Sequence, residues 1–442
     1  MIAALDRPTF YAMANRLWGS ASGLLTAVLV AAFFTPELQG YYFTFLSLLT
    51  LQTFIELGFG ELLQQFVSHE WAMISSSDAS ERERAHDRLS CLVRFSLRYY
   101  GSIALVLFIG LGVGGTIYFG TFAKGGEIHW ASGWWLAVVA TAISVLLVPL
   151  FSLLEGANRT EKVHGVWLWQ GVASRVSGFL AIALGFGLLT ITITRIVSFA
   201  AGLAGLGRES FSMIRRLWSR GESQETVSFR QELWPLQWRF ALSWLSGYVV
   251  YSLFTPVLFA FHGAELAGRM GLTTAAATAI SSAAFAVMAT RVPRLAILAA
   301  RRDFPAMDAL FRRATIASVG ISALGAAVFL GGLGLAHQIG PSLATRFLPI
   351  PETALFLSAL VLQQVRFAMG SYLRAHKAEP FVMLSALEGM IAIPLFTLLG
   401  RQYEAMGMVL GFLGLTTVTL VPAISIFERC RKLWHQPRWA EA

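Results

Sequence analysis

The chain has 442 residues, of which 56% are apolar and 13% are charged, whereas a typical soluble domain has about 25% charged residues. This composition excludes an ordinary soluble protein and predicts an all-α integral membrane protein. The formal net charge of +9 would suggest nucleic acid as the partner of a soluble protein, but here the positions of the cations relate it to membrane orientation.

Long apolar runs recur along the chain. A helix needs about 20 apolar residues to cross a hydrocarbon core of about 30 Å, because each residue rises about 1.5 Å. The sequence predicts twelve such spans, at residues 17–35, 41–65, 97–119, 134–154, 164–186, 189–207, 240–261, 270–290, 314–337, 352–373, 381–400 and 405–427. The longest basic stretch between spans lies near the midpoint. We therefore expect two six-helix lobes, 1–207 and 240–442, joined by a basic cytoplasmic linker at 208–239.

The cations are distributed unevenly between the two sides of these spans. The amino end, the loops after even-numbered spans and the carboxyl end hold 27 of the 34 Lys and Arg residues. The opposite side holds only Lys124, Arg269, Arg346 and Arg401. This positive-inside pattern predicts that both termini are cytoplasmic. The excess of Arg over Lys and the high Ala content suggest a bacterium, and so a bacterial cytoplasmic (inner) membrane.

Two short sequences return about half the chain later. Glu37-Leu38-Gln39-Gly40 is matched by Glu265-Leu266-Ala267-Gly268, 228 positions on, and Ser152-Leu153-Leu154 by Ser371-Tyr372-Leu373, 219 positions on. The matches favour a duplicated architecture whose halves insert the same way up. Coincidence in a chain rich in Leu and Ala is the alternative.

Signatures of soluble enzymes are absent or occur in the wrong context. Gly110 to Gly115 fits GxGxxG, but it lies inside an apolar span with no strand before it, so close helix packing explains it better than dinucleotide binding. The sequence contains no HExxH, CxxC or Walker motif. We therefore expect no metal site, no cofactor and no catalysed reaction.

Ionisable residues inside the predicted spans are the most informative. Arg175, Arg195 and Arg366 are the cations, and Glu56 and Glu388 are the acidic counterparts. A charge at the bilayer centre costs at least about 2.5 to 3.5 kcal/mol, so each should face the bundle interior or a water-filled cavity.

Two interpretations of these charges remain open at this point. In the first, Arg175 or Arg195 pairs with Glu56, and Arg366 pairs with Glu388, as structural ion pairs. In the second, the guanidinium groups line a cavity and hold an anionic head group, since their planar fork suits phosphate oxygens. Arg366 could also snorkel toward the cytoplasm.

The opening hairpin carries a family resemblance, in Pro36-Glu37-Leu38-Gln39-Gly40-Tyr41 followed by Leu57-Gly58-Phe59-Gly60. With twelve spans and a basic central loop, the chain resembles the multidrug/oligosaccharidyl-lipid/polysaccharide (MOP) exporter superfamily. It is most similar to the polysaccharide-transporter branch, which includes O-antigen and capsule repeat-unit flippases. The resemblance covers nearly the whole chain.

Similarity to that branch implies two lobes around a central cavity that is often cationic in the amino-terminal lobe. It implies movement of a polyprenyl-pyrophosphate-linked oligosaccharide across the membrane, with membrane lipids and other polysaccharide assembly proteins as partners and no nucleic acid. Arg16, Arg175 and Arg195 match the cationic positions by location. The candidate cavity residues are Arg16, Glu56, Arg175, Arg195, Arg366 and Glu388.

Two departures from the patterns of related families disfavour some of the functions found in the superfamily. Lipid II flippases carry two extra helices, which disfavours a peptidoglycan precursor as cargo. Drug extruders commonly place a carboxylate in the first helix, and residues 17–34 contain none. The alternatives are a cation-coupled multidrug antiporter using Glu56 and, less favoured, a membrane polysaccharide polymerase, which would need a larger outer loop.

Overall fold

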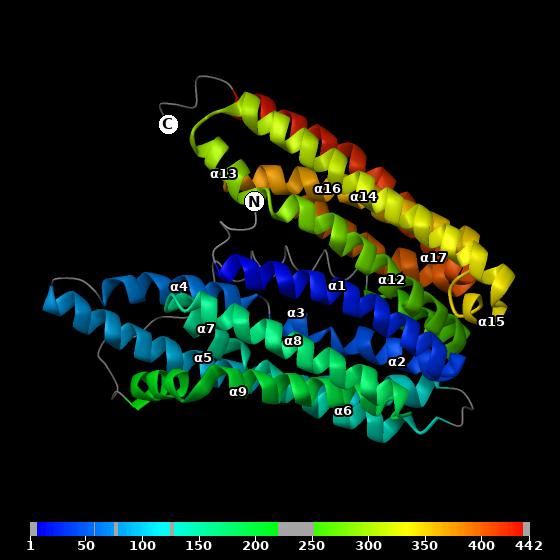
Figure 1. Ribbon diagram of the computed structural model, residues 1–442, viewed down its shortest axis with the longest axis horizontal. Coiled ribbons are helices and arrows are strands. Elements are labelled where there is room, and N and C mark those ends of the chain that lie inside the picture. The colour runs from blue at the N-terminus through cyan, green and yellow to red at the C-terminus, as the bar shows by residue number, and fades with distance from the viewer. Residues whose placement is uncertain (1–6, 57, 75–77, 124–127, 220–251, 436–442) are drawn as a thin grey trace. The chain divides into compact units, whose positions relative to one another are not determined.

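The computed structural model describes residues 7–56, 58–74, 78–123, 128–219 and 252–435. Within these ranges the chain forms helices and contains no strand (Figure 1). The helices are α1 (Arg7–Phe33), α2 (Pro36–Leu49), α3 (Gln52–Glu56), α4 (Phe59–Met73), α5 (Ala79–Phe122), α6 (Trp130–Val145), α7 (Val148–Gly156), α8 (Thr160–Ala183), α9 (Leu189–Ser219), α11 (Phe254–His262), α12 (Ala264–Ala289), α13 (Val292–Ala300), α14 (Phe304–Ile339), α15 (Pro341–Ala344), α16 (Ile350–Ala375) and α17 (Val382–Trp434).

Eight of the described helical stretches are long and apolar enough to cross a membrane. The fold is therefore that of an all-α, multi-pass membrane protein, as the composition predicts. Several predicted spans appear in altered form. The second is divided among α2, α3 and α4, and the last two are joined in α17, where Tyr403 and Glu404 leave the helical conformation.

By internal packing the chain divides into two units. Unit 1 comprises Met1–Ser22 and Phe45–Trp244, and unit 2 comprises Gly23–Thr44 and Leu245–Ala442. The outer part of the opening hairpin thus packs with the second half of the chain. Most of the predicted linker at 208–239, and residues 240–251 of the seventh predicted span, lie outside the described residues.

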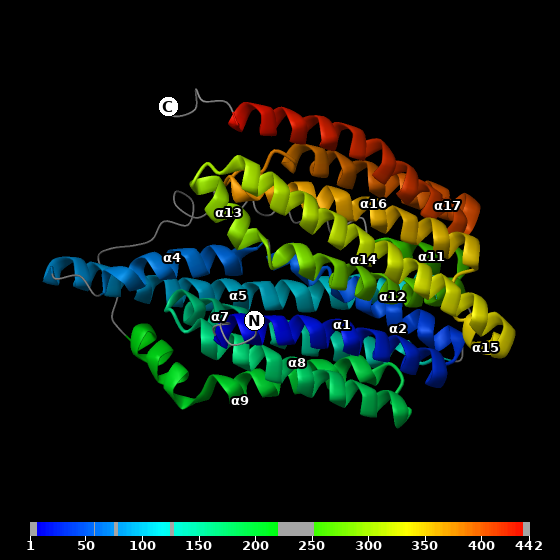
Figure 2. The same ribbon diagram turned by 45° about the horizontal axis from the view of Figure 1, so that its top comes forward.

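Unit 1 is built from antiparallel neighbours, including α5 beside α6 and α8 beside α9 (Figure 2). Trp134 of α6 is completely buried and packs on Phe45 and Phe119. Its indole nitrogen donates a hydrogen bond to the carbonyl oxygen of Leu111, 3.1 Å away. A Cβ on Gly115 would collide with the Trp134 ring, so the glycine-rich sequence serves helix packing, as its context predicts.

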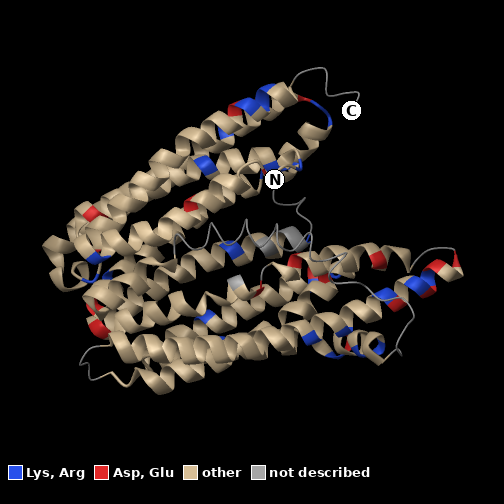
Figure 3. Cartoon of the chain, turned by 180° about the vertical axis from the view of Figure 1, so that it is seen from behind, with Lys and Arg blue, Asp and Glu red and all other residues tan. Residues whose placement is uncertain are grey.

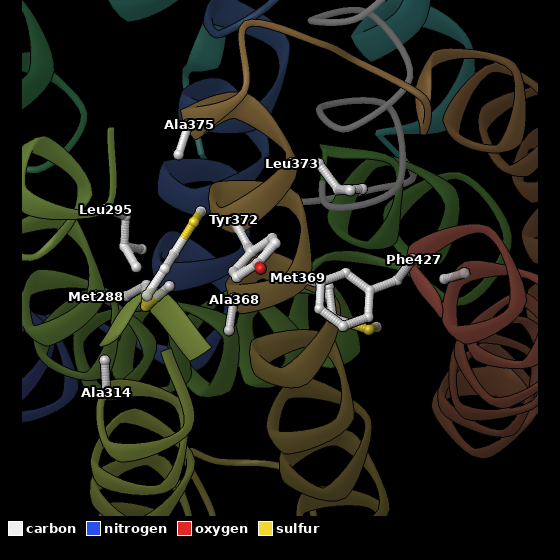
Figure 4. Close-up of a cluster of buried hydrophobic side chains, with 11 residues drawn as sticks. Met288, Leu295, Ala314, Ala368, Met369, Tyr372, Leu373, Ala375 and Phe427 are labelled. Atoms are coloured by element: carbon white, nitrogen blue, oxygen red, sulfur yellow. The ribbon is translucent and has the colours of Figure 1, made fainter. Parts of the chain in front are cut away.

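Unit 2 packs α12, α14, α16 and α17 side by side around an apolar core at one end. Figure 4 shows Tyr372 in this core, between Met288 and Leu295 on one side and Phe427 on the other. Most of the unit's Lys and Arg residues lie at this same end, near the turns after α12, α13 and α16 and the close of α17 (Figure 3). The opposite end carries Arg269, Arg346 and Arg401.

The first repeated sequence forms a reciprocal contact within unit 2. Helices α2 and α12 begin at Pro36 and Ala264, and the Glu-Leu-x-Gly match falls in the first turns of both. A Cβ on Gly40 would collide with the Ala264 carbonyl oxygen, and one on Gly268 would lie 3.1 Å from the Pro36 carbonyl oxygen. Each glycine faces the first residue of the other helix, as in a contact with two-fold symmetry.

Side chains from the same end of unit 2 hold this contact together. The Gln39 amide nitrogen donates to the carbonyl oxygens of Gly268, at 2.9 Å, and Arg346, at 3.1 Å. The guanidinium of Arg346 donates in turn to the Phe34 carbonyl oxygen. The glycines are therefore needed because two backbones approach closely, not because the turn requires their conformational freedom.

Substitution of either glycine should separate the two helices. We expect Gly40→Ala and Gly268→Ala each to lower stability by about 1 to 3 kcal/mol, since the obstructing atoms are backbone and cannot rotate away. Thermal unfolding of the purified protein in detergent measures this. Gly23→Ala, in the same hairpin but with nothing within 4 Å of its Cβ position, is the matched control and should change little. Equal losses in the control would contradict the packing argument.

The two copies of the second repeated sequence also lie at equivalent positions in their helices. Ser152 and Ser371 are both buried, near the ends of α7 and α16. Each helix is followed by a residue with positive φ: Asn158 at 59° and Lys377 at 59°. These two residues are again 219 positions apart in the sequence. Both sequence repeats therefore occupy equivalent structural positions: the first lies at the starts of α2 and α12, and the second lies near the ends of α7 and α16.

Candidate functional site

Arg175 lies about midway along α8, a helix that packs against α9 in unit 1 and contacts α1 through Gly171. The Trp18 indole donates to the Gly171 carbonyl oxygen at 3.2 Å, and a Cβ on Gly171 would lie 2.9 Å from the Asn15 side-chain oxygen. The Arg175 side chain is exposed, and it makes no hydrogen bond or ion pair with any residue in the described part of the chain. It is therefore available to a ligand.

Arg16 and Arg195 lie on the two helices that flank α8. Arg16 is exposed on α1, one turn before Ser20, whose hydroxyl donates to the Arg16 carbonyl oxygen at 3.2 Å. Arg195 is half-buried on α9, and Thr194 beside it lies against Gly178 of α8. The three predicted cationic positions of the amino-terminal half thus occur on α1, α8 and α9.

Glu56 ends the short helix α3 and contacts α5. Its carboxylate accepts a hydrogen bond from the Tyr100 hydroxyl at 3.0 Å, and Tyr100 itself is fully buried. Among the described residues Glu56 forms no ion pair, so the predicted alternative in which it neutralises Arg175 or Arg195 does not occur there. Glu56 is instead a carboxylate held by a neutral hydroxyl.

The glycines that follow Glu56 explain its position. Gly58 adopts a left-handed conformation, with φ 66°, and this breaks the helix between α3 and α4. Phe59 is then fully buried against Phe95 and Tyr99. A Cβ on Gly60 would lie 3.2 Å from the Tyr100 hydroxyl, so glycine there leaves room for the Tyr100 contact with Glu56.

Arg366 and Glu388 form an ion pair between α16 and α17 in unit 2. The Glu388 side chain is only 3% exposed, and the Arg366 guanidinium also donates to the Thr419 hydroxyl at 3.3 Å. The pairing that the sequence left open is therefore present here. Arg366 already pairs with a carboxylate of the protein, whereas Arg175 has no such partner among the described residues.

A further polar cluster in unit 2 has no motif in the sequence. Arg431 binds the Asp308 carboxylate, with its closest nitrogen 2.6 Å from the carboxylate oxygen. The Tyr372 hydroxyl donates to Asp308 at 2.8 Å and lies 3.0 Å from His435 Nε2. Because the hydroxyl proton goes to Asp308, neutral His435 can donate from Nε2 to the Tyr372 oxygen. His376 packs on Trp434 beside this cluster, with ring centroids 4.5 Å apart.

Both histidines of this cluster favour the neutral form. Burial lowers the pKa of His376 and of His435, and for His376 the nearby His435 lowers the pKa further. In addition, His376 Nε2 is buried with no hydrogen-bond partner among the described residues. Protonation would therefore place a charge where the folded protein does not stabilise it.

The sign of the pH dependence follows from these lowered pKa values. As the pH falls, histidines in the unfolded chain take up protons at about pH 6.5, whereas those in the folded protein take them up only at lower pH. The contribution of these histidines to folding stability is therefore complete above about pH 6.5, and it falls as the pH drops toward the pKa values of the folded protein. The loss should stay below about 1.4 kcal/mol per histidine and pH unit, because solvent screens both partly exposed rings. Unfolding temperatures measured from pH 8 to pH 5 test this. His376→Phe should make the dependence shallower, and an unchanged slope would contradict the assignment.

Comparisons with known proteins give a match in structure alone. No protein-family model and no curated protein matches the sequence. The lipid II flippase MurJ in an inward closed conformation matches with a TM-score of 0.62 and 15% identity, covering 95% of this chain and 89% of MurJ. An inward-facing multidrug resistance MATE transporter of the MOP superfamily matches at 0.61 and 13%, covering 100% and 98%.

A third solved structure agrees with these two. A single-residue mutant of the MATE transporter VcmN from Vibrio cholerae matches with a TM-score of 0.61 and 16% identity, covering 97% of both chains. The chain therefore has the fold of the MOP superfamily transporters, which confirms the resemblance drawn from the opening hairpin, and its described helices fit the expected number of about twelve transmembrane helices.

Proposed function

We propose that the protein is a flippase that moves a polyprenyl-pyrophosphate-linked oligosaccharide across the bacterial cytoplasmic membrane for cell-surface polysaccharide biosynthesis. The observation that carries this proposal is Arg175, a cation midway along α8, the helix that corresponds to the predicted span 164–186, with no hydrogen-bond or ion-pair partner in the described residues. Its cost in the membrane is offset if an anionic cargo binds there. The similar fold of MurJ, a lipid II flippase, supports a lipid-linked cargo.

The chemistry required of the protein is binding and release. A guanidinium can donate two parallel hydrogen bonds to a phosphate group, which suits a pyrophosphate. Arg16 and Arg195, on the helices that flank α8, would provide further positive charge. The two predicted lobes, 1–207 and 240–442, would alternate in access while the polyprenyl tail stays in lipid, with both termini cytoplasmic. No covalent bond is made or broken.

A second candidate is a cation-coupled multidrug antiporter. Glu56 favours it, because a carboxylate within a predicted span, held by Tyr100 and without a cationic partner in the described ranges, could carry a proton. The similarity in fold to MATE transporters fits this candidate equally well. The two candidates differ in the charge of the cargo and in the residue that recognises it.

Purified protein in liposomes distinguishes the candidates. For a flippase, a fluorescent polyprenyl-pyrophosphate oligosaccharide should become accessible on the opposite leaflet. Arg175→Ala should stop this movement, whereas the Glu56→Gln variant should still bind the cargo. For an antiporter, a labelled cationic drug should move against a proton gradient, and Glu56→Gln should stop it. Drug transport without lipid movement would overturn the proposed function.

A further inference from the structure

A basic cavity lies at one end of unit 2, and its lining includes none of the residues considered above as cargo ligands. It occupies about 580 Å³ between the end of α12, the short helix α13 and the first turns of α14. Its lining residues are Val287, Arg291, Arg294, Leu298, Ala306, Ala309, Leu310, Arg313, Ala314 and Ala317. Three arginines thus share one cavity with an otherwise apolar lining.

Within the described part of the chain, no acidic side chain pairs with the three arginines. The side chains of Arg291, Arg294 and Arg313 are exposed and make no hydrogen bond or ion pair with other described residues. The nearest acidic residues in the sequence are used elsewhere: Asp303 caps α14 at the Ala306 amide, and Asp308 binds Arg431 and Tyr372. Three like charges around one cavity repel one another unless an anion occupies it.

A cavity of similar size in unit 1 shows the contrast. It occupies about 680 Å³ and is lined in part by Arg159 and Lys162. There Arg159 pairs with Glu209 at 2.8 Å, and Lys162 donates to the Ser210 hydroxyl at 2.9 Å. Protein partners therefore compensate the cations of the unit 1 cavity, whereas no described residue compensates those of the unit 2 cavity.

The apolar residues that line the cavity show where it lies relative to the predicted membrane spans. Four alanines line it along α14, from Ala306 to Ala317, a distance of about 16 Å at 1.5 Å per residue. Ala317 at one end, and Val287 on α12, fall within predicted membrane spans, whereas Arg294 lies on α13 outside them. Arg313 lies between Ala309 and Ala314, so Ala314 and Ala317 continue the lining from the arginines into the predicted span. Such a lining fits a molecule with an anionic head and an apolar chain.

We propose that Arg291, Arg294 and Arg313 bind the phosphate group of a membrane lipid, whose chain lies along Ala314 and Ala317 of α14. Phosphate is the anion that matches several guanidinium forks at once. A lipid headgroup and a free phosphate share this chemistry, and the alanine lining favours the lipid. The site is separate from Arg175 and requires only that this end of unit 2 lies at the membrane surface, so it does not depend on the cargo.

Lipid binding to the full-length protein in detergent tests the site. Native mass spectrometry would follow titration with dioctanoyl phosphatidylglycerol, with dioctanoyl phosphatidylcholine as the zwitterionic comparison and inorganic pyrophosphate as the free anion. Arg291→Gln, Arg294→Gln and Arg313→Gln together should weaken phosphatidylglycerol binding at least about tenfold. Arg301→Gln, Arg312→Gln and Arg429→Gln together remove the same charge from exposed positions outside the cavity and form the matched control.

Each outcome decides the proposal. Loss in the cavity variant with binding kept in the control supports a built phosphate site, and weak phosphatidylcholine binding supports selection of an anionic headgroup. Equal loss in both triple variants would show attraction to surface charge alone and would overturn the site. Displacement of the lipid by equimolar pyrophosphate would overturn the lipid assignment and leave a free-anion site. Because no transport is measured, failure here is distinct from failure of the proposed flippase.

Discussion

Replacing Arg175 with alanine should lower lipid transport about 100-fold, because two charge-assisted hydrogen bonds of about 1.5 kcal/mol each would be lost. The folded protein should persist at its normal level, since Arg175 has no hydrogen-bond or ion-pair partner among the described residues. Export of the oligosaccharide in cells, with the amount of membrane protein measured in parallel, gives the result. Loss of protein along with loss of export would instead assign Arg175 a structural role.

Two further variants sharpen this test. Arg175→Lys keeps the charge but removes the planar fork, so full activity in this variant would contradict bidentate recognition of phosphate. Arg208→Ala removes an exposed arginine of the same helix pair, beyond the kink at Gly207, and should leave export unchanged. Arg195→Ala should also abolish export if the flanking helices contribute to the same anion.

Replacing Arg366 alone should destabilise unit 2 strongly. Arg366→Met leaves the Glu388 carboxylate buried without its counter-charge, and breaking a buried pair in this way costs about 3 to 5 kcal/mol. Thermal or denaturant unfolding of the purified protein measures the loss. Replacing both partners with apolar residues, as Arg366→Met with Glu388→Leu, should restore most of the stability, because no lone charge remains.

An exposed ion pair near the end of the same helix supplies the control. Arg374 and Glu379 lie 3.9 Å apart with both side chains more than 40% exposed. Arg374→Gln should therefore cost less than about 1 kcal/mol. If Arg366→Met were as mild as this variant, or if the double variant were as damaged as the single one, the account of Arg366 as a structural partner would be wrong.

Much of the fold follows from the sequence because membrane insertion imposes simple lengths and polarity. Apolar runs of about 20 residues predict the helices, and the match of Gly40 with Gly268 indicates a duplicated element before any contact is known. The Arg366 and Glu388 pair could be proposed because a charge inside a span needs a partner. These inferences need only local composition and spacing.

Other features depend on long-range packing. Helix α5 begins at Ala79, well before its predicted span at residue 97, because helices continue beyond the apolar region that defines a span. The break at Gly58 needs a left-handed residue, which the sequence permits but does not require. Asp308, Tyr372 and Arg431 meet only after α14, α16 and α17 have packed, and no short motif joins them. The same holds for the arginine cavity beside α14.

The most direct test of the central proposal is made in cells depleted of this protein. Their lipids would be extracted, and any polyprenyl-pyrophosphate oligosaccharide that accumulates would be identified and assigned to a leaflet. A flippase predicts complete repeat units that are accessible only from the cytoplasmic side. Complete units on the outer leaflet, or no accumulation together with new sensitivity to cationic drugs, would contradict it.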